Sequence, residues 1–405
     1  MISMMSALVG HGAQHRTSKN LKVIENPPPS HSRHCVPLMT SNDDPQNHFD
    51  ALRLISAFAI IISHYFALRD GNNDLEPFHR LSGVCNLGKV VTYVCFVISG
   101  ELVTRAYLRK PAVVRFLLRR AVRVLPALWV CIFVSVGVGA VLTTILPHQY
   151  WNASQTRHFI ANGLLYPNHY NLPGLLNQFA EDDPRNAVNG SLWVIPPLFL
   201  MYVSLPLLDL LRLLRRPGTL LLIAALMLVA WESLELHGLS PQSRFYKYHI
   251  WLLFIPHLAF FFYCGVAAAA WGKRLPLSFS VFGLLLAMIG ISFWLRHGQS
   301  IVLTLCLPYL TLYLGFARLP GARALDRMGC IALGVYLYSY PVQHLFMHFR
   351  WRNFSVTEQM LYPCIVCAGI GMLSWWLIES PLMRLVAKNR DGQPLSLLAP
   401  MSKAA

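Results

Sequence analysis

Apolar residues gather into ten long runs along the chain, and shorter polar segments separate them. Each run is about 17 to 22 residues long, and a helix of that length matches the roughly 30 Å hydrocarbon core of a bilayer. The pattern predicts transmembrane helices at residues 51–69, 85–104, 124–146, 191–211, 219–236, 250–270, 277–295, 300–316, 329–348 and 360–378. We therefore expect an all-α fold, a polytopic membrane helix bundle with about ten transmembrane helices.

Composition agrees with a membrane protein and changes how the positive charge is interpreted. Hydrophobic residues make up 55% of the 405 residues and charged residues 13%, whereas soluble domains carry about 25% charged residues. The formal net charge of +16 would suggest a nucleic-acid partner in a soluble protein. Here the basic residues concentrate in alternate loops, most densely between residues 105 and 123. This asymmetry follows the positive-inside rule, so we expect cytoplasmic termini, a bilayer environment and no nucleic acid.

The ends of the chain are polar, and the cysteines are dispersed. Residues 1–48 contain no apolar run long enough for a signal peptide. We expect a disordered cytoplasmic arm there, a transmembrane domain at 49–388 and a short cytoplasmic tail at 389–405. Cys364 and Cys367 form a CxxC pair inside an apolar run, but without a second pair or histidines they do not predict a metal site.

The first apolar run carries two ionisable residues, Arg53 and His64. They are eleven residues apart, so on a helix they share one stripe, about 16 Å apart along the axis. A guanidinium at membrane depth costs on the order of 3 kcal/mol, and such groups usually face the interior of a bundle or a wet cavity. The pair is a candidate catalytic site. The alternative is structural: Arg53 reaches lipid phosphate, and His64 bonds to a nearby carbonyl.

The densest basic cluster, RFLLRRAVRVLP, leads into the third apolar run. Arg120 and Arg123 are three residues apart and share a helical face, with Arg119 adjacent. Arginine binds phosphate through two parallel hydrogen bonds. The number of basic residues exceeds what topology needs, which favours a phosphate-bearing ligand that approaches from the cytoplasm. Topology alone, or contact with anionic lipid, is the alternative.

The longest connection, residues 147–190, ends in the segment AVNGSLW. Loops of this length tend to be functional or disordered. Asn189, Ser191 and Trp193 then lie at a membrane boundary, where an indole face and amides suit a hydroxyl-rich ligand. The same residues could instead serve as a helix cap and an interfacial anchor.

The last two apolar runs carry further polar residues. The segment ALGVYLYSYPVQHLF includes Tyr338 among several polar-tipped side chains, which indicates a lined cavity rather than lipid contact. The final run closes with IESP and puts Glu379 at its inner end. Glu379 either pairs with a nearby arginine or orients one that holds the ligand.

Taken in order, these segments resemble the acyltransferase-3 family. The segments are LRLISAFAIIISHYF, FVISG, FLLRRAVRVLP, LPG, AVNGSLW, LGVYLYSYPVQ and IESP, and the resemblance covers about residues 48–388. The family comprises bacterial multi-pass membrane proteins that O-acylate cell-surface or exported carbohydrates. The resemblance implies a bacterial inner-membrane enzyme, with acetyl-CoA or another acyl-CoA used as a co-substrate from the cytoplasmic side. It also implies a polysaccharide or lipid-linked glycan as acceptor near the outer face.

The resemblance also implies roles for individual residues. The family's first-helix arginine and histidine fall on Arg53 and His64, its RxxR pair on Arg120 and Arg123, and its terminal glutamate on Glu379. Its asparagine, serine and tryptophan fall on Asn189, Ser191 and Trp193. We predict Arg53 and His64 as catalytic, with His64 as general base or acyl relay. Donor-binding residues are predicted as Arg119, Arg120, Arg123 and Glu379, and acceptor-binding residues as Asn189, Ser191, Trp193 and Tyr338.

Two other functions remain open from the sequence. The polar stripes could form the pathway of a transporter or flippase for a lipid-linked sugar, although no internal repeat of the kind common in transporters is evident. The chain also has Leu198 where the family tends to carry a glutamate, and this departure is compatible with a catalytically degenerate family member.

Overall fold

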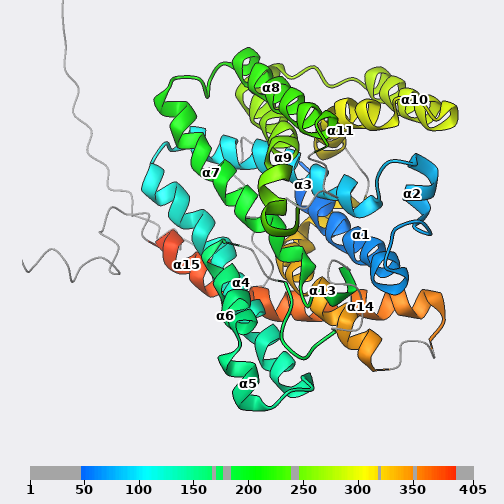
Figure 1. Cartoon of the computed structure of the whole chain (residues 1–405). Helices are drawn as coiled ribbons and strands as arrows, with labels where there is room; N and C mark the ends of the chain where they lie inside the picture. The colour runs from blue at the N-terminus through cyan, green and yellow to red at the C-terminus, as the bar shows by residue number, and fades with distance from the viewer. Residues whose placement is uncertain are drawn as a thin grey trace, which may run out of the picture. The chain divides into compact units, whose positions relative to one another are not determined.

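A computed structural model describes residues 47–166, 170–176, 184–238, 246–317, 321–349 and 354–388, without the side chains of 184, 246–252, 273 and 387–388. The predicted arm at 1–48, apart from its last two residues, and the predicted tail at 389–405 lie outside this range. Every regular element among the described residues is helical (Figure 1). The all-α prediction is confirmed.

Eight helical segments are long and apolar enough to cross a membrane. Five of them are single helices: α1 (Phe49–Asp70), α3 (Leu87–Arg109), α4 (Val113–Leu142), α8 (Pro217–Leu236) and α11 (Gln299–Phe316). The others are Leu253–Trp271 within α9 (Tyr246–Trp271), Gly190–Leu210 across η3 (Gly190–Val194) and α7 (Ile195–Leu210), and Val356–Val386 across α14 (Val356–Ser374), a π-helical turn η7 (Trp375–Glu379) and α15 (Ser380–Lys388). The shorter apolar α10 (Phe279–Leu295) and the more polar α13 (Ala332–His348) occupy the two remaining predicted positions, as expected for a polytopic bundle of about ten spans.

Short helices fill several of the connections between spans. They are α2 (Pro77–Ser82), α5 (Pro147–Asn152), α6 (Ser154–Ala161), η1 (Asn162–Leu164), η2 (Pro184–Asn186), η4 (Gly272–Arg274), α12 (Ala322–Met328) and η5 (Gly329–Ile331). The connection at 147–190 is therefore partly helical in its described residues. The sequence pattern predicts no helix in this connection, because helices as short as these produce no periodic apolar pattern.

The basic cluster lies on a helix rather than in a loop. The apolar run predicted a helix from residue 124, whereas α4 begins at Val113 and includes Arg115, Arg119 and Arg120 in its first turns. Arginine and leucine favour helices, so the backbone continues past the point where apolar residues end. Arg120 and Arg123 consequently project from one rigid helix.

Two buried hydrophobic clusters hold the bundle together. One is built largely from α3, α7, α8 and α9, and the other from α1, α4 and α13. α1 packs against α3 and α13, while α13 packs against α14 and α3 packs against α9 (Figure 1). α1 therefore lies between helices of both clusters.

The contact between α3 and α9 depends on two glycines. A Cβ added to Gly100 would overlap the carbonyl oxygen of Phe262, and one added to Gly265 would overlap that of Val97. Small residues let transmembrane backbones approach closely. The absence of a side chain at Gly100 and Gly265 therefore allows α3 and α9 to pack closely.

The start of α1 is held by residues far away in the sequence. Its N-cap residue, His48, makes no side-chain cap. The carboxylate of Asp326 on α12 instead accepts from the backbone N–H of Ala51 at 2.9 Å and contacts His48 Nδ1 at 2.6 Å. A carboxylate at a helix N-terminus satisfies free N–H groups and complements the helix dipole. This contact fixes the end of α1 that carries Asp50 and Arg53.

Candidate active site

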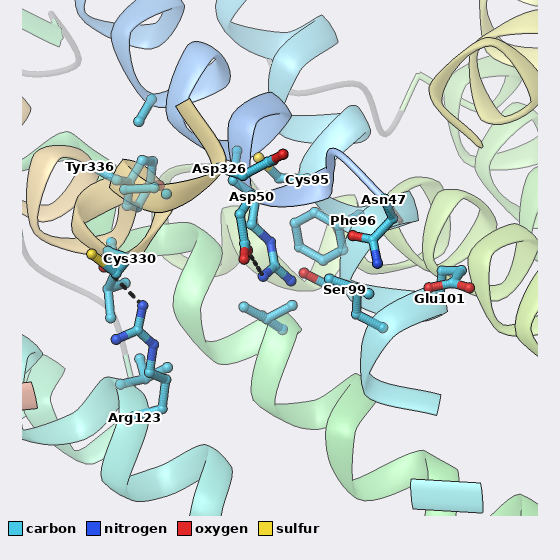
Figure 2. Close-up of a pocket in the computed structure, with 18 of the residues that line it drawn as sticks. Asn47, Asp50, Cys95, Phe96, Ser99, Glu101, Arg123, Asp326, Cys330 and Tyr336 are labelled. Atoms are coloured by element: carbon cyan, nitrogen blue, oxygen red, sulfur yellow. Dashed lines mark hydrogen bonds and ion pairs between the residues drawn. The ribbon is translucent and has the colours of Figure 1, made fainter. Parts of the chain in front are cut away.

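A cavity of about 620 Å³ lies between the two hydrophobic clusters. Seven arginines and three carboxylates line it: Arg53, Arg105, Arg109, Arg120, Arg123, Arg323 and Arg327 with Asp50, Glu101 and Asp326. Figure 2 shows Asp50, Ser99, Arg123 and Tyr336 on its walls, from four different helices. The walls also include apolar residues such as Phe96, Val124 and Leu198. An arginine-rich wall beside an apolar one suits a ligand with both anionic and apolar parts.

Arg123 is fixed by three contacts. Its guanidinium donates to the carbonyl of Cys330 at 3.0 Å (Figure 2). It is also ion-paired with Glu379 and lies 4.7 Å from the centre of the Trp375 ring. Glu379 is fully buried and also accepts from the Ser374 hydroxyl at 3.1 Å. The π-helical turn η7 carries both Trp375 and Glu379, and such turns are frequent at functional sites. Glu379 therefore contacts and orients a cavity arginine and does not itself line the cavity.

Arg120 lies one turn before Arg123 on α4 and has no carboxylate partner among the described residues. Its Nε is buried without a hydrogen-bond partner, and its guanidinium lies 5.8 Å from the Phe116 ring centre. An arginine is never deprotonated in a protein, so this charge needs an anion. The side chain lines the cavity and is available for a ligand. Arg119, the third predicted member of the cluster, is half-buried and does not line the cavity.

Arg53 lines the same cavity from α1. It pairs with Asp50, one turn before it, at 3.4 Å. The pair is partly exposed to the cavity, so the contact leaves donors of the guanidinium free to meet a ligand. The structure thus brings together Arg53, Arg120 and Arg123, which lie on two helices.

His64 lies beyond the end of this cavity. Along α1 the cavity lining runs from Asp50 to Ile60, and His64 is one turn further on. Its ring lies 5.0 Å from that of Tyr340, edge to face, and its Nδ1 is buried without a hydrogen-bond partner in the described part of the chain. His64 points into protein, and a single helical turn separates it from the arginine-lined space.

The segment predicted to bind the acceptor, Asn189 to Trp193, is held in place by contacts with α13 and α9. The Asn189 amide donates to the carbonyl of Leu337 at 3.0 Å and accepts from the backbone N–H of Ser191 at 3.1 Å. The Tyr336 hydroxyl donates to the Ser191 carbonyl at 2.5 Å. The Trp193 ring lies 5.2 Å from that of Phe254. These contacts fasten the segment to α13 and α9, while direct contact with a sugar stays a prediction.

Tyr338 lies in the hydrophobic cluster of α1, α4 and α13, and it does not line the cavity. Tyr336, two residues earlier, lines it instead. The sequence analysis also did not select Asp50, Asp326 or Tyr202 as site residues, although all three line the cavity. Asp50 could have been found from its spacing to Arg53, because residues three apart on a helix share a face. Asp326 and Tyr202 carry no comparable local signal.

Comparison with known proteins identifies the family of this chain. The model of the acyltransferase-3 family, described as an acyltransferase domain, matches residues 47–379. An O-acetyl transferase of Shigella phage Sf6 is 24% identical over 360 residues, covering 87% of this chain and 98% of that protein. Nodulation protein 10 of Rhizobium leguminosarum bv. viciae is 26% identical over 366 residues, covering 84% and 94%. No solved structure matches. Since the family model spans most of the chain, including every cavity arginine, this protein belongs to the acyltransferase-3 family of membrane acyltransferases.

Proposed function

We propose that this protein is an inner-membrane O-acetyltransferase that moves an acetyl group from acetyl-CoA to a hydroxyl of a cell-surface or exported carbohydrate. The observation that carries the proposal is the arginine-lined cavity, in which Arg120 has no acidic partner among the residues that the structure describes. The phage relative named an O-acetyl transferase, which aligns over 87% of this chain, supports the choice of acetyl transfer.

Acetyl-CoA suits the cavity because its charge and its reactive group lie at opposite ends. The nucleotide end carries phosphates, which arginines bind through paired hydrogen bonds. The pantetheine arm is uncharged, consists of methylene and methyl groups with two amides and a hydroxyl, and ends in the thioester. We assign the phosphates to Arg120 and Arg123 and the arm to the apolar wall that includes Leu198 and Val124. The basic residues at the start of α4 mark this end as cytoplasmic under the positive-inside rule, which also places the termini in the cytoplasm.

Arg53 belongs with the donor in this scheme. It is about 16 Å from His64 along the axis of α1, which exceeds the reach of its side chain. One acetyl group therefore cannot touch both residues. We propose that Arg53 holds the donor in the cavity and that the thioester lies near Ile60, where the α1 lining ends.

His64 is the proposed general base. A neutral imidazole accepts the proton of the attacking hydroxyl, the oxygen forms a bond to the acetyl carbon, and the carbon–sulfur bond breaks. The leaving CoA sulfur then takes the proton from the imidazolium. The Nδ1 atom of His64 has no hydrogen-bond partner among the described residues, and this supports a role in which the substrate provides that partner. The cavity ends at Ile60, one helical turn before His64. The side chains between these two positions must therefore move aside for the two substrates to meet.

The test is transfer of labelled acetyl groups by purified protein in lipid nanodiscs, with radiolabelled acetyl-CoA and candidate glycans. Label on the glycan is the expected result. His64→Ala should bind acetyl-CoA normally and lose about 10²- to 10⁴-fold in transfer rate. His148→Ala, an exposed histidine on α5, is the matched control and should keep its rate. Movement of a lipid-linked sugar across the bilayer without label transfer would replace the proposal with a flippase. Donor binding without either activity would indicate a degenerate family member.

A further inference from the structure

A second buried histidine lies beside the proposed base. His344 on α13 is 7% exposed, and its ring is 5.2 Å from that of Tyr340, which also contacts His64. Tyr340 therefore lies against both imidazoles. The backbone of Ala187 faces one nitrogen of His344, and the other nitrogen has no hydrogen-bond partner in the described part of the chain.

The neighbouring Gln343 is in a similar state. Its side chain is fully buried, and its Nε2 donates to the Ile61 carbonyl of α1 at 2.8 Å. This bond fixes Gln343 one turn from His64, and the Oε1 of Gln343 has no hydrogen-bond partner among the described residues. Among the described residues, the buried atoms without a partner near this point are thus His64 Nδ1, Gln343 Oε1 and one nitrogen of His344. Buried polar atoms are nearly always hydrogen-bonded, so such a cluster indicates a ligand or water that the protein alone does not supply.

Part of the long connection forms one wall of this cluster. A Cβ added to Gly190 would lie 2.9 Å from the Tyr340 ring, so the backbone there packs directly on Tyr340. The backbone of Ala187 faces His344. One turn of η2 packs on α1, where Arg185 lies against Gly71. The wall therefore comes from the connection at the end of α1 opposite the arginine cavity.

We propose that His344 and Gln343 bind the acceptor carbohydrate and present its hydroxyl to His64. A neutral imidazole offers one donor and one acceptor, and the Gln343 oxygen offers another acceptor. Sugar hydroxyls can both donate and accept hydrogen bonds, so neighbouring hydroxyls of a sugar can pair with these atoms of His344 and Gln343. The methyl group of the acetyl donor can form no hydrogen bond with them. This inference rests on the proposed function and adds residues to its acceptor side.

The test separates acceptor binding from donor binding and from stability. His344→Phe keeps a flat ring and removes the hydrogen bonds, while His344→Asn keeps a donor and an acceptor. His348→Phe, an exposed histidine one turn further along α13, is the matched control. Methyl hexopyranosides of gluco, galacto and manno configuration serve as defined acceptors, with radiolabelled acetyl-CoA as donor.

We expect His344→Phe to raise the acceptor KM at least tenfold, with the affinity for acetyl-CoA unchanged. His344→Asn should recover part of this loss, and His348→Phe should match the wild type. An unchanged acceptor KM in His344→Phe, with label still transferred, would overturn this inference and leave the proposed function standing. A weakened donor affinity would reassign His344 to the donor side. No label on any glycoside from the wild type would count against both proposals.

Discussion

Arg120 and Arg123 lie one turn apart on α4 and line the same cavity, yet only Arg123 has a carboxylate partner in the described residues. Glu379 neutralises Arg123 and fixes its direction, while Arg120 keeps its charge for a ligand. The two arginines therefore differ in what their substitution should do. Loss of Arg120 should affect ligand binding, and loss of the Arg123 contact should affect folding as well.

Arg120→Ala should weaken acetyl-CoA binding with little change in stability. A hydrogen bond to a charged group contributes about 1.5–3 kcal/mol, which corresponds to roughly a 10- to 100-fold loss in affinity. Calorimetric titration of the purified variant with acetyl-CoA measures the loss. Arg115→Ala is the control, because Arg115 lies on the same helix but is exposed and outside the cavity. Equal affinities for Arg120→Ala and the wild type would return Arg120 to a topological role.

Glu379→Gln should destabilise the protein because it leaves the Arg123 guanidinium, whose side chain is only 18% exposed, without its counter-charge. Breaking a buried ion pair by removing one partner costs about 3–5 kcal/mol. The thermal midpoint of the variant in detergent should fall clearly below that of the wild type. A double variant, Arg123→Gln with Glu379→Gln, should recover much of the loss while remaining inactive. If the double variant were as unstable as the sum of the singles, the two residues would not act as a pair.

Asp326→Ala should weaken the start of α1. It removes the carboxylate that accepts from the Ala51 N–H, and loss of a helix cap costs about 0.5–2 kcal/mol. We expect a lower thermal midpoint and weaker donor binding, since the same helix end carries Arg53. Asp74→Ala, an exposed aspartate before α2, controls for loss of surface charge. A normal midpoint in Asp326→Ala would mean that the cap is dispensable.

Gly100→Ala should reduce the yield of folded protein. The added methyl group meets the Phe262 carbonyl of α9, and overpacking of this kind costs about 1–3 kcal/mol. Size-exclusion chromatography and the thermal midpoint report the effect. Gly283→Ala on α10 is the control, because nothing lies within 4 Å of its Cβ position. Normal folding of Gly100→Ala would show that α3 and α9 can separate without loss.

The sequence pattern predicted the parts of the site that lie within single helices. Arg53 and His64 were placed on one stripe of the first helix by their spacing, and Arg120 with Arg123 by theirs. The sequence could not decide whether Glu379 simply pairs with an arginine or orients one that holds the ligand, because its partner Arg123 is 256 residues away. The start of α4 is predicted eleven residues too late, because the helix begins at Val113 in the basic segment whereas the apolar run begins only at residue 124.

The sequence by itself determined that the chain enters a bilayer as apolar helices, which residues share a helical face, and which family the motifs resemble. These follow from helical period and bilayer thickness, which act along the chain. Only the tertiary structure decided that Arg53 joins Arg120 and Arg123 around one cavity. It also decided that, among the described residues, Arg123 has a carboxylate partner in Glu379 while Arg120 has none, and that Tyr340 contacts both His64 and His344. These relationships depend on which helices pack together. The packing is set by contacts between residues far apart in the sequence, such as the contact of Gly100 with α9.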